Sequence, residues 1–202
     1  MRAIVRALPV AIAFCALALQ ASAQPALPSE WSRGTAVGGF AGVGADGSHA
    51  SGLFGGTLGW DLNPRVAIQG SGGWAQYGDG ADAFSASLGA RFNLLRWQRV
   101  NPFVNTGIGF YRASFEPGAS ASDFYQRRRP TGIPHSALQS TFTDPSFVFG
   151  GGFDIAVNRR MKIRPEVNVD MVFHDSRTNA VPSFRMHFVY VFEHHPVTRM
   201  HR

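Results

Sequence analysis

Residues 162–173 alternate strictly between polar and apolar side chains. The even positions carry Lys162, Arg164, Glu166, Asn168 and Asp170, and the odd positions carry Ile163, Pro165, Val167, Val169, Met171 and Phe173. A period of two places successive side chains on opposite faces of a β-strand, whereas the helical period of 3.6 would scatter the charges around the axis. The pattern therefore predicts a strand with one charged face and one apolar face.

The same alternation recurs along the chain and divides it into eight candidate strands. The first of them is rich in glycine, and the pattern leaves its facing ambiguous. The predicted strands lie at about 34–45, 51–62, 65–77, 82–93, 101–115, 146–157, 161–173 and 183–193. Each is about ten residues or longer, and a transmembrane β-strand needs ~9–11 residues.

The connections between these strands fall into two classes. Asn63-Pro64 and Asn158-Arg159-Arg160 are typical of tight turns, and 94–100 is somewhat longer. The other set comprises longer loops, of which 116–145 is the longest and is rich in Gly, Pro and Ser; its members are 46–50, 78–81, 116–145 and 174–182. Short turns at one end and long loops at the other are typical of outer-membrane barrels, with the N-terminus on the periplasmic side.

Aromatic residues gather near both ends of the predicted strands. Those expected near the periplasmic ends are Trp60, Phe92, Tyr190 and Phe192, with Trp97 in the adjacent turn. Those expected near the outer ends are Trp74, Tyr77, Phe84, Phe110, Phe147 and Phe173. Two aromatic girdles at the two membrane interfaces are a feature of transmembrane barrels.

The predicted architecture is all-β, an eight-stranded antiparallel up-and-down transmembrane β-barrel. Closure is required because each unpaired backbone group in hydrocarbon costs several kcal/mol. Eight strands leave an interior that side chains just fill. The residues predicted to form a polar network in this lumen are Asp61, Arg91, Asp154, Lys162, Arg164, Glu166, Asp170 and Arg185. Inward glycines are expected to make room for the arginines: Gly55, Gly59, Gly89, Gly107, Gly109, Gly150 and Gly152.

Residues 1–23 are interpreted as a secretory signal peptide. Arg2 and Arg6 precede an apolar run that is too short to cross a bilayer, and small residues lead up to a cleavage point after Ala23. A short periplasmic segment (24–33), the barrel (34–193) and a C-terminal tail (194–202) follow. The single Cys15 lies in the signal segment, so the exported chain is expected to contain no disulfide.

The composition narrows the class of protein. Only 16% of the 202 residues are charged, while Gly (23) and Phe (17) are abundant. An average chain has about 25% charged residues, so disorder and coiled coil are both disfavoured. A soluble lipocalin-like barrel, with its charged faces in water, stays open as an alternative. The girdles and the low charge favour the membrane.

The chain resembles the small outer-membrane β-barrel family of the OmpA and OmpX type. The resemblance rests on the eight alternating strands and on Gly150-Gly151-Gly152-Phe153-Asp154, followed by Asn158-Arg159-Arg160 and 162–173, and covers about 34–193. It implies an integral bacterial outer-membrane protein with a structural or surface-interaction role. Its partners would be outer-membrane lipids, lipopolysaccharide and the assembly machinery, which reads a terminal aromatic such as Phe192. Nucleic acid is not expected as a partner, and the chain is expected to be a monomer.

Two motifs could carry chemistry. His174-Asp175-Ser176 resembles the His-x-Ser pair of lipid A deacylases, but Arg177 stands where that family has Asn, and no Glu follows on the next strand. No enzyme is therefore expected. Arg127-Arg128-Arg129, in the longest loop, is a candidate site for lipopolysaccharide phosphate, because guanidinium groups bind phosphate bidentately.

Two further possibilities concern metals and solutes. The tail residues His194, His195 and His201 lack a Cys or a nearby acidic cluster, so neither a metal site nor a cofactor is expected. A polar lumen also leaves open a narrow channel for small solutes.

Overall fold

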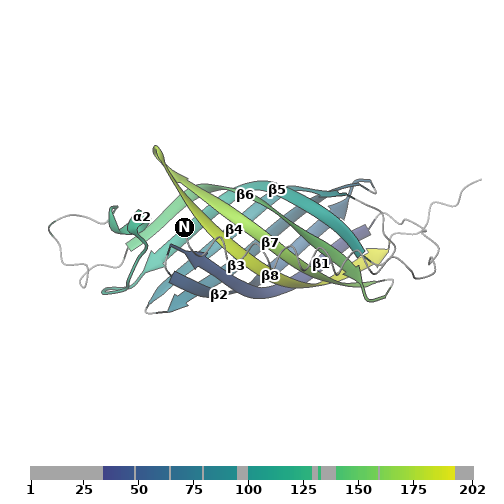
Figure 1. Ribbon diagram of the computed structural model, residues 1–202, viewed down its shortest axis with the longest axis horizontal. Helices are drawn as coiled ribbons and strands as arrows, with labels where there is room; N and C mark the ends of the chain where they lie inside the picture. The colour runs from purple at the N-terminus through teal and green to yellow at the C-terminus, as the bar shows by residue number, and fades with distance from the viewer. Residues whose placement is uncertain are drawn as a thin grey trace, which may run out of the picture. The chain divides into compact units, whose positions relative to one another are not determined.

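Eight antiparallel strands close into a barrel in the computed structural model, which describes residues 34–47, 49–63, 65–78, 80–94, 100–128, 132, 140–158 and 160–193. Each strand pairs with the next along the chain, and the last returns to the first (Figure 1). The strands are β1 (Gly34–Asp46), β2 (His49–Asp61), β3 (Val66–Gly78), β4 (Ala81–Asn93), β5 (Val100–Phe115), β6 (Ser140–Ala156), β7 (Met161–His174) and β8 (Arg177–Glu193). The predicted eight-stranded up-and-down barrel is confirmed.

One short helix, α2 (Asp123–Gln126), lies in the connection between β5 and β6. Among the described residues, no helix is long and apolar enough to span a membrane. The predicted signal peptide at 1–23, the segment 24–33 and the tail 194–202 lie outside the described residues, as does Trp97.

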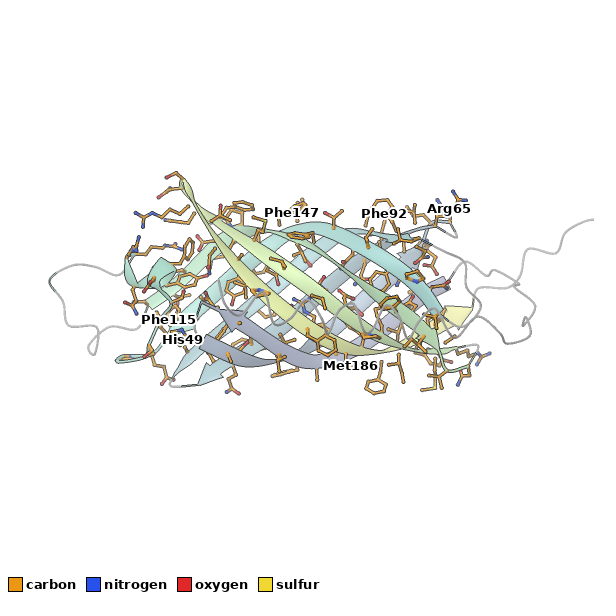
Figure 2. All side chains as sticks on the ribbon, in the orientation of Figure 1. His49, Arg65, Phe92, Phe115, Phe147 and Met186 are labelled. Carbon is orange, nitrogen blue, oxygen red and sulfur yellow. The ribbon has the colours of Figure 1, made fainter. Side chains whose placement is uncertain are left out.

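Most charged strand residues point into the barrel, and most large apolar side chains point out (Figure 2). On β7, Arg164 and Glu166 are each 2% exposed. Val167, which lies between Glu166 and Asn168, is 55% exposed. The lipocalin-like alternative is therefore wrong, since it requires the opposite polarity. The outward apolar side chains include Leu58, Trp60, Leu88, Phe92, Ile108, Phe110, Phe147, Phe149, Phe188, Tyr190 and Phe192.

Closure joins β1 to β8 along an unbroken register from Gly34 opposite Glu193 to Gly44 opposite Ser183. The seam leaves no free sheet edge over this length, so the ladder satisfies its own backbone groups away from water.

The two periplasmic turns whose asparagines the structure describes use the same device. Asn63 Oδ1 accepts hydrogen bonds from the backbone N–H of Arg65 and Val66, at 2.8 and 2.9 Å. Asn158 Oδ1 accepts from Arg160 and Met161 at 2.9 and 2.8 Å. Each side chain substitutes for a backbone partner in a tight reversal, as the sequence predicts.

Two strands begin earlier than the alternation predicts. β6 starts at Ser140 and not near 146, and β8 starts at Arg177 and not near 183, so the predicted loops 116–145 and 174–182 were too long. The β7–β8 connection is a tight turn at Asp175 and Ser176, with Asp175 at φ 51°. The outward residues of these strand ends include polar side chains such as Thr141, Thr143 and Thr178, so the apolar alternation that marks a membrane-facing strand is absent there.

The inward glycines allow neighbouring strands to approach closely, a role that the sequence prediction did not include. A Cβ at Gly152 would meet the carbonyl oxygen of Pro165 on β7. A Cβ at Gly55 would meet the Phe40 ring at 2.5 Å, and one at Gly73 would meet it at 2.8 Å. At none of the seven predicted positions is an arginine side chain among the three nearest contacts. The small residues thus allow adjacent strands and one ring to approach closely on the concave wall.

Candidate functional site

Eight charged lumen residues lie in the middle of the barrel and toward the end opposite the outer mouth. We call them the ionic plug: Asp61, Arg91, Asp154, Lys162, Arg164, Glu166, Asp170 and Arg185. Asp154 is its centre, because it accepts a hydrogen bond from Arg164 Nε to Oδ1 at 2.5 Å. Arg91 Nη1 lies 3.4 Å and Lys162 Nζ 3.8 Å from Asp154 Oδ2. Arg91 Nη2 also lies 3.4 Å from Asp61 Oδ1. These groups come from β2, β4, β6 and β7, so the contacts cross the lumen.

Uncharged groups extend the ionic plug across the barrel. Arg164 Nη1 donates to Gln69 Oε1 on β3 at 3.2 Å. The Phe103 ring lies 5.2 Å from the guanidinium carbon of Arg164 and 5.6 Å from that of Arg91. Cation–π contact of this kind gives a buried guanidinium a favourable surface that needs no hydrogen bond.

The middle of the barrel holds a second set of contacts. Glu166 Oε1 accepts hydrogen bonds from Asn168 Nδ2 at 2.5 Å and from Asn105 Nδ2 at 3.0 Å. His187 Nε2 lies 3.4 Å from Glu166 Oε2. Arg185 Nη2 donates to Asp170 Oδ2 at 3.0 Å. Every charge in this layer therefore faces an opposite charge or an amide.

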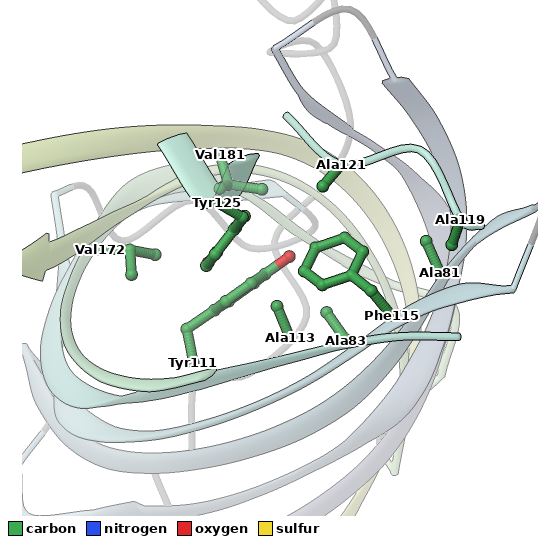
Figure 3. Close-up of a cluster of buried hydrophobic side chains, with 10 residues drawn as sticks. All are labelled: Ala81, Ala83, Tyr111, Ala113, Phe115, Ala119, Ala121, Tyr125, Val172 and Val181. Carbon is green, nitrogen blue, oxygen red and sulfur yellow. The ribbon is translucent and has the colours of Figure 1, made fainter. Parts of the chain in front are cut away.

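Apolar and aromatic groups fill the outer mouth of the barrel, which we call the mouth cluster: Ala81, Ala83, Tyr111, Ala113, Phe115, Ala119, Ala121, Tyr125, Val172 and Val181 (Figure 3). Residues 116–128, which we call the lid, contribute Ala119, Ala121 and Tyr125. Tyr125 on α2 is 0% exposed, and its ring centroid lies 5.3 Å from that of Phe115. The lid thus folds back over the lumen and inserts an aromatic ring into it.

Burial raises the pKa of Tyr125, and the negative charges of Asp46 and Asp144 add to the effect. Its hydroxyl is buried and has no hydrogen-bond partner among the described residues. Below Tyr125, the hydroxyls of Tyr77 and Tyr111 are hydrogen-bonded at 2.7 Å. Tyr77 therefore lies inside the barrel, and its assignment to the outer aromatic girdle was wrong. Side chains alternate between the two faces of a strand, so Tyr77 at an odd position and Trp74 at an even position point to opposite faces of β3.

A three-residue contact, which we call the latch, fastens the lid to the barrel wall. Arg128 Nη1 and Nη2 donate to the two oxygens of Asp144 at 2.5 and 3.2 Å. His174 Nδ1 lies 3.0 Å from Asp144 Oδ1. The Arg128 guanidinium also stacks over the Phe142 ring, 4.4 Å from its centroid. Arg128 is thus engaged internally, Arg127 is exposed, and Arg129 lies outside the described residues.

The deacylase-like motif is not arranged for catalysis. His174 directs Nδ1 to Asp144, and its Nε2 lies 3.4 Å from Asp175 Oδ2. Both ring nitrogens are therefore directed at carboxylates and not at the Ser176 hydroxyl. Within the part of the chain that the structure describes, no three His, Cys, Asp or Glu residues are placed to hold a metal ion.

The structure places all eight predicted lumen residues inside the barrel. Six are fully buried, while the side chains of Lys162 and Asp61 are 25% and 20% exposed near the periplasmic end. Sequence reasoning missed other members of the lumen, namely Phe40, Gln69, Tyr77, Asn105, Tyr111 and His187. Strand parity was the available signal for most of them, since His187 shares a face with Arg185.

Comparison with known proteins agrees with this architecture. The model of the outer membrane protein beta-barrel domain family matches residues 11–191. No curated protein matches the chain in sequence. Among solved structures, Neisserial surface protein A is similar at 12% identity, over 80% of this chain and 96% of that chain, with a TM-score of 0.56. Ail of Yersinia pestis matches at 13% identity, over 80% and 98%, with a TM-score of 0.48.

OprG from Pseudomonas aeruginosa also matches at 13% identity, over 81% of this chain and 98% of that chain, with a TM-score of 0.48. At 12% identity, the similarity to Neisserial surface protein A supports the fold alone. The family model covers most of the chain, and its description places the family in the outer membrane. The chain therefore belongs to the outer membrane protein beta-barrel domain family.

Proposed function

We propose that this protein is a non-conducting and non-enzymatic barrel that supports the outer membrane and contacts its surroundings through the loops at its outer end. The observation that carries the proposal is that the lumen is closed at two levels. The ionic plug fills the lower and middle barrel, and the lid fills the mouth.

The cavities left in the lumen argue against the channel alternative. The one beneath the mouth cluster, lined by Tyr77, Tyr111 and Arg185, measures about 30 Å³. The one beside Asn105 and Glu166 measures about 20 Å³. A water molecule needs roughly 10–15 Å³ on this measure, so each cavity holds one or two waters. Neither cavity is large enough to hold a hydrated ion or a small solute, which supports a closed lumen.

Arg127 is the residue that supports a surface contact of the lid with lipopolysaccharide. It directly follows α2 and is exposed, while the latch holds its neighbour Arg128 against Asp144. A single exposed guanidinium can pair with phosphate, although less firmly than the predicted run of three.

The absence of enzymatic activity is part of the proposal. Both nitrogens of His174 are directed at carboxylates, and Ser176 lies in the exposed β7–β8 turn. A lipid A deacylation assay on the wild-type protein and on Ser176→Ala is expected to show no activity in either. Release of fatty acid by the wild type that Ser176→Ala abolishes would overturn this part of the proposal.

Conductance in planar bilayers tests the whole proposal. The refolded protein is expected to give no discrete conductance steps in KCl. A porin reconstituted in the same way is the positive control. Steady ohmic steps from the wild-type protein would contradict the closed lumen. Recovery of the protein in the soluble periplasmic fraction, and not in outer membranes, would contradict its placement in the envelope.

A further inference from the structure

A hollow on the outer wall of the barrel is larger than the lumen cavities described above. Its volume is about 720 Å³, and it is lined by side chains of β4, β5, β6 and β7. Leu88 and Ile108 on its floor are 61% and 71% exposed, although both are large apolar groups. Its lining residues are Leu88, Ile108, Gly109, Pro145, Ser146, Phe147 and Phe173. We call this hollow the wall groove.

The sheet register explains the shape of the wall groove. Leu88, Ile108 and Phe147 form one row across β4, β5 and β6, because Ile108 is opposite Leu88 on one side and opposite Phe147 on the other. In the next row toward the outer end, Phe110 is opposite Pro145 on one side and the small Ala86 on the other. Of this row only Pro145 lines the hollow, and together with Gly109, which has no side chain, it leaves open the space beside Ile108, Phe147 and Phe173.

The wall groove lies in the outer half of the membrane-facing surface. Phe84 and Phe110 lie beside it, with ring centroids 5.9 Å apart, and Trp74 continues this aromatic ladder 6.3 Å from Phe84. Aromatic rings of this kind mark the interface between hydrocarbon and headgroups. The groove therefore opens onto the acyl chains of the outer leaflet.

One cationic side chain lies between the wall groove and the outer end of the barrel. Arg112 follows Phe110 by two positions on the same outward face of β5, is exposed, and lies opposite Thr143 on β6. Diagonal neighbours in a sheet are about 7–8 Å apart, which places Arg112 within reach of the groove edge at Pro145. Among the strand residues that the structure describes, Arg112 is the only lysine or arginine with outward-facing parity.

Two carboxylates lie near Arg112, but neither is paired with it, so Arg112 can still bind a ligand. Asp82 on β4 interacts with Arg112 electrostatically, and Glu116 interacts with Asp82. Within the described part of the chain, neither carboxylate forms an ion pair with Arg112 at 4.0 Å or less. A multiply charged phosphate can compete with these carboxylates, neither of which is fully buried, because guanidinium binds phosphate in a bidentate manner.

We infer that the wall groove and Arg112 together bind lipid A, the phosphorylated and multiply acylated lipid of the outer leaflet. One acyl chain lies in the wall groove beside Ile108, Phe147 and Phe173, and a phosphate pairs with Arg112 and the Thr143 hydroxyl. The inference rests on the outer-membrane function proposed above and gives it a second lipid contact, on the wall and not on the lid. Charge at the rim and apolar surface below match the two ends of such a lipid.

Native mass spectrometry of the folded protein, released from neutral detergent micelles with added lipid A, tests the polar end of the site. Arg112→Gln is expected to weaken lipid A binding about tenfold, the effect of losing one charge-assisted contact. The matched control is Arg160→Gln, which removes an exposed arginine at the opposite, periplasmic rim. Equal weakening by both variants, or by neither, would overturn the inference.

A second pair of variants tests the apolar end. Ile108→Trp fills the wall groove. Leu58→Trp adds the same ring on β2, at a position that is 57% exposed and lies outside the wall groove. Ile108→Trp is expected to weaken lipid A binding about tenfold and Leu58→Trp less than twofold. Each substituted residue is exposed, and gel mobility that shifts on heating verifies that each variant has folded.

Two phospholipids decide which lipid the site recognises. Phosphatidylglycerol offers an acyl chain and one phosphate, and phosphatidylcholine offers the same with a masking ammonium. Lipid A is expected to bind at least tenfold more tightly than either. Binding of phosphatidylglycerol as tightly as lipid A would overturn the assignment. Failure of the proposed function itself would appear elsewhere, as conductance by the wild type or as its absence from outer membranes.

Discussion

The two ends of the lumen are closed by different means. The ionic plug is built from strand residues, and its charges pair across the barrel between β2, β4, β6, β7 and β8. The outer mouth of the barrel is closed by the lid, a segment between two strands. The lid packs apolar side chains into the mouth cluster, and the latch holds it to the barrel wall. The plug cannot be disturbed without disturbing the sheet, whereas the lid can leave while the sheet stays intact. The comparison separates a closure that is part of folding from one that is added to the fold.

The largest effect is expected in the ionic plug. Arg185→Met leaves Asp170, which is 4% exposed, without its ion-pair partner, and removal of one partner of a buried pair costs about 3–5 kcal/mol. Urea unfolding of the barrel in lipid vesicles measures the free energy of unfolding. The double variant Arg185→Met, Asp170→Leu removes both charges and is expected to lie within about 1 kcal/mol of the wild type. A single variant as stable as the double would refute the view that the pair balances a buried charge.

The next effect is expected in the lid. Tyr125→Ala removes a fully buried ring, and such truncations cost about 3–5 kcal/mol in a core. Here the loss falls on lid docking, so the urea unfolding of the barrel is expected to change by less than about 1 kcal/mol. A cysteine introduced at Ala113 in the mouth cluster, in a chain lacking Cys15, reports the opening by its rate of thiol labelling. Labelling at the wild-type rate would show that Tyr125 does not hold the lid.

A smaller effect is expected at the latch. Asp144→Asn retains the shape of the side chain but removes the charge that faces Arg128 and His174, and a hydrogen bond to a charged group contributes about 1.5–3 kcal/mol. The same thiol labelling is expected to rise less than in Tyr125→Ala. Asp123→Asn, at an exposed position of α2, is the matched control and is expected to behave as wild type. Faster labelling in the control than in Asp144→Asn would separate the latch from lid closure.

The smallest effect concerns alkaline pH. Because burial raises the pKa of Tyr125, the closed lid keeps this phenol neutral while an open lid lets it ionise near its ordinary pKa of about 10. The stabilisation of the closed state is therefore complete below pH ~10 and declines as the pH rises above that value. Tyr125→Phe is expected to label more slowly than the wild type at pH 11 and equally at pH 8. Tyr77 and Tyr111 remain in both proteins, so the difference isolates Tyr125.

The alternation of residues along the strands carried most of the fold because the bilayer imposes it. Val167 and Glu166 face hydrocarbon and lumen respectively, and this contrast between the two faces produces the regular two-residue pattern. The starts of β6 and β8 escaped prediction for the same reason. Thr141 and Thr143 face outward above the apolar belt, where a polar outward side chain costs nothing and leaves no signature.

The ionic plug was predictable as a set of residues, but its pairing was not. Parity alone assigns Arg164 and Asp154 to the lumen, while their 2.5 Å contact depends on the register between β6 and β7. The lid had no local signature. The burial of Tyr125 depends on partners from β5 and β6, and the pairing of Arg128 with Asp144 spans a connection whose path the sequence does not define. The Arg127-Arg128-Arg129 run therefore suggested a ligand site where the structure uses its middle member as an internal fastener.

The pairing of the ionic plug across the barrel has a consequence for biogenesis. Arg91 finds its two carboxylates on β2 and β6, and Arg164 reaches Gln69 on β3, so an incomplete sheet would present these charges without their counterparts. Such an intermediate cannot enter hydrocarbon strand by strand, because each uncompensated charge opposes insertion. Closure of the ring thus lowers the cost of burying these charges in the membrane, because only the complete sheet pairs each of them.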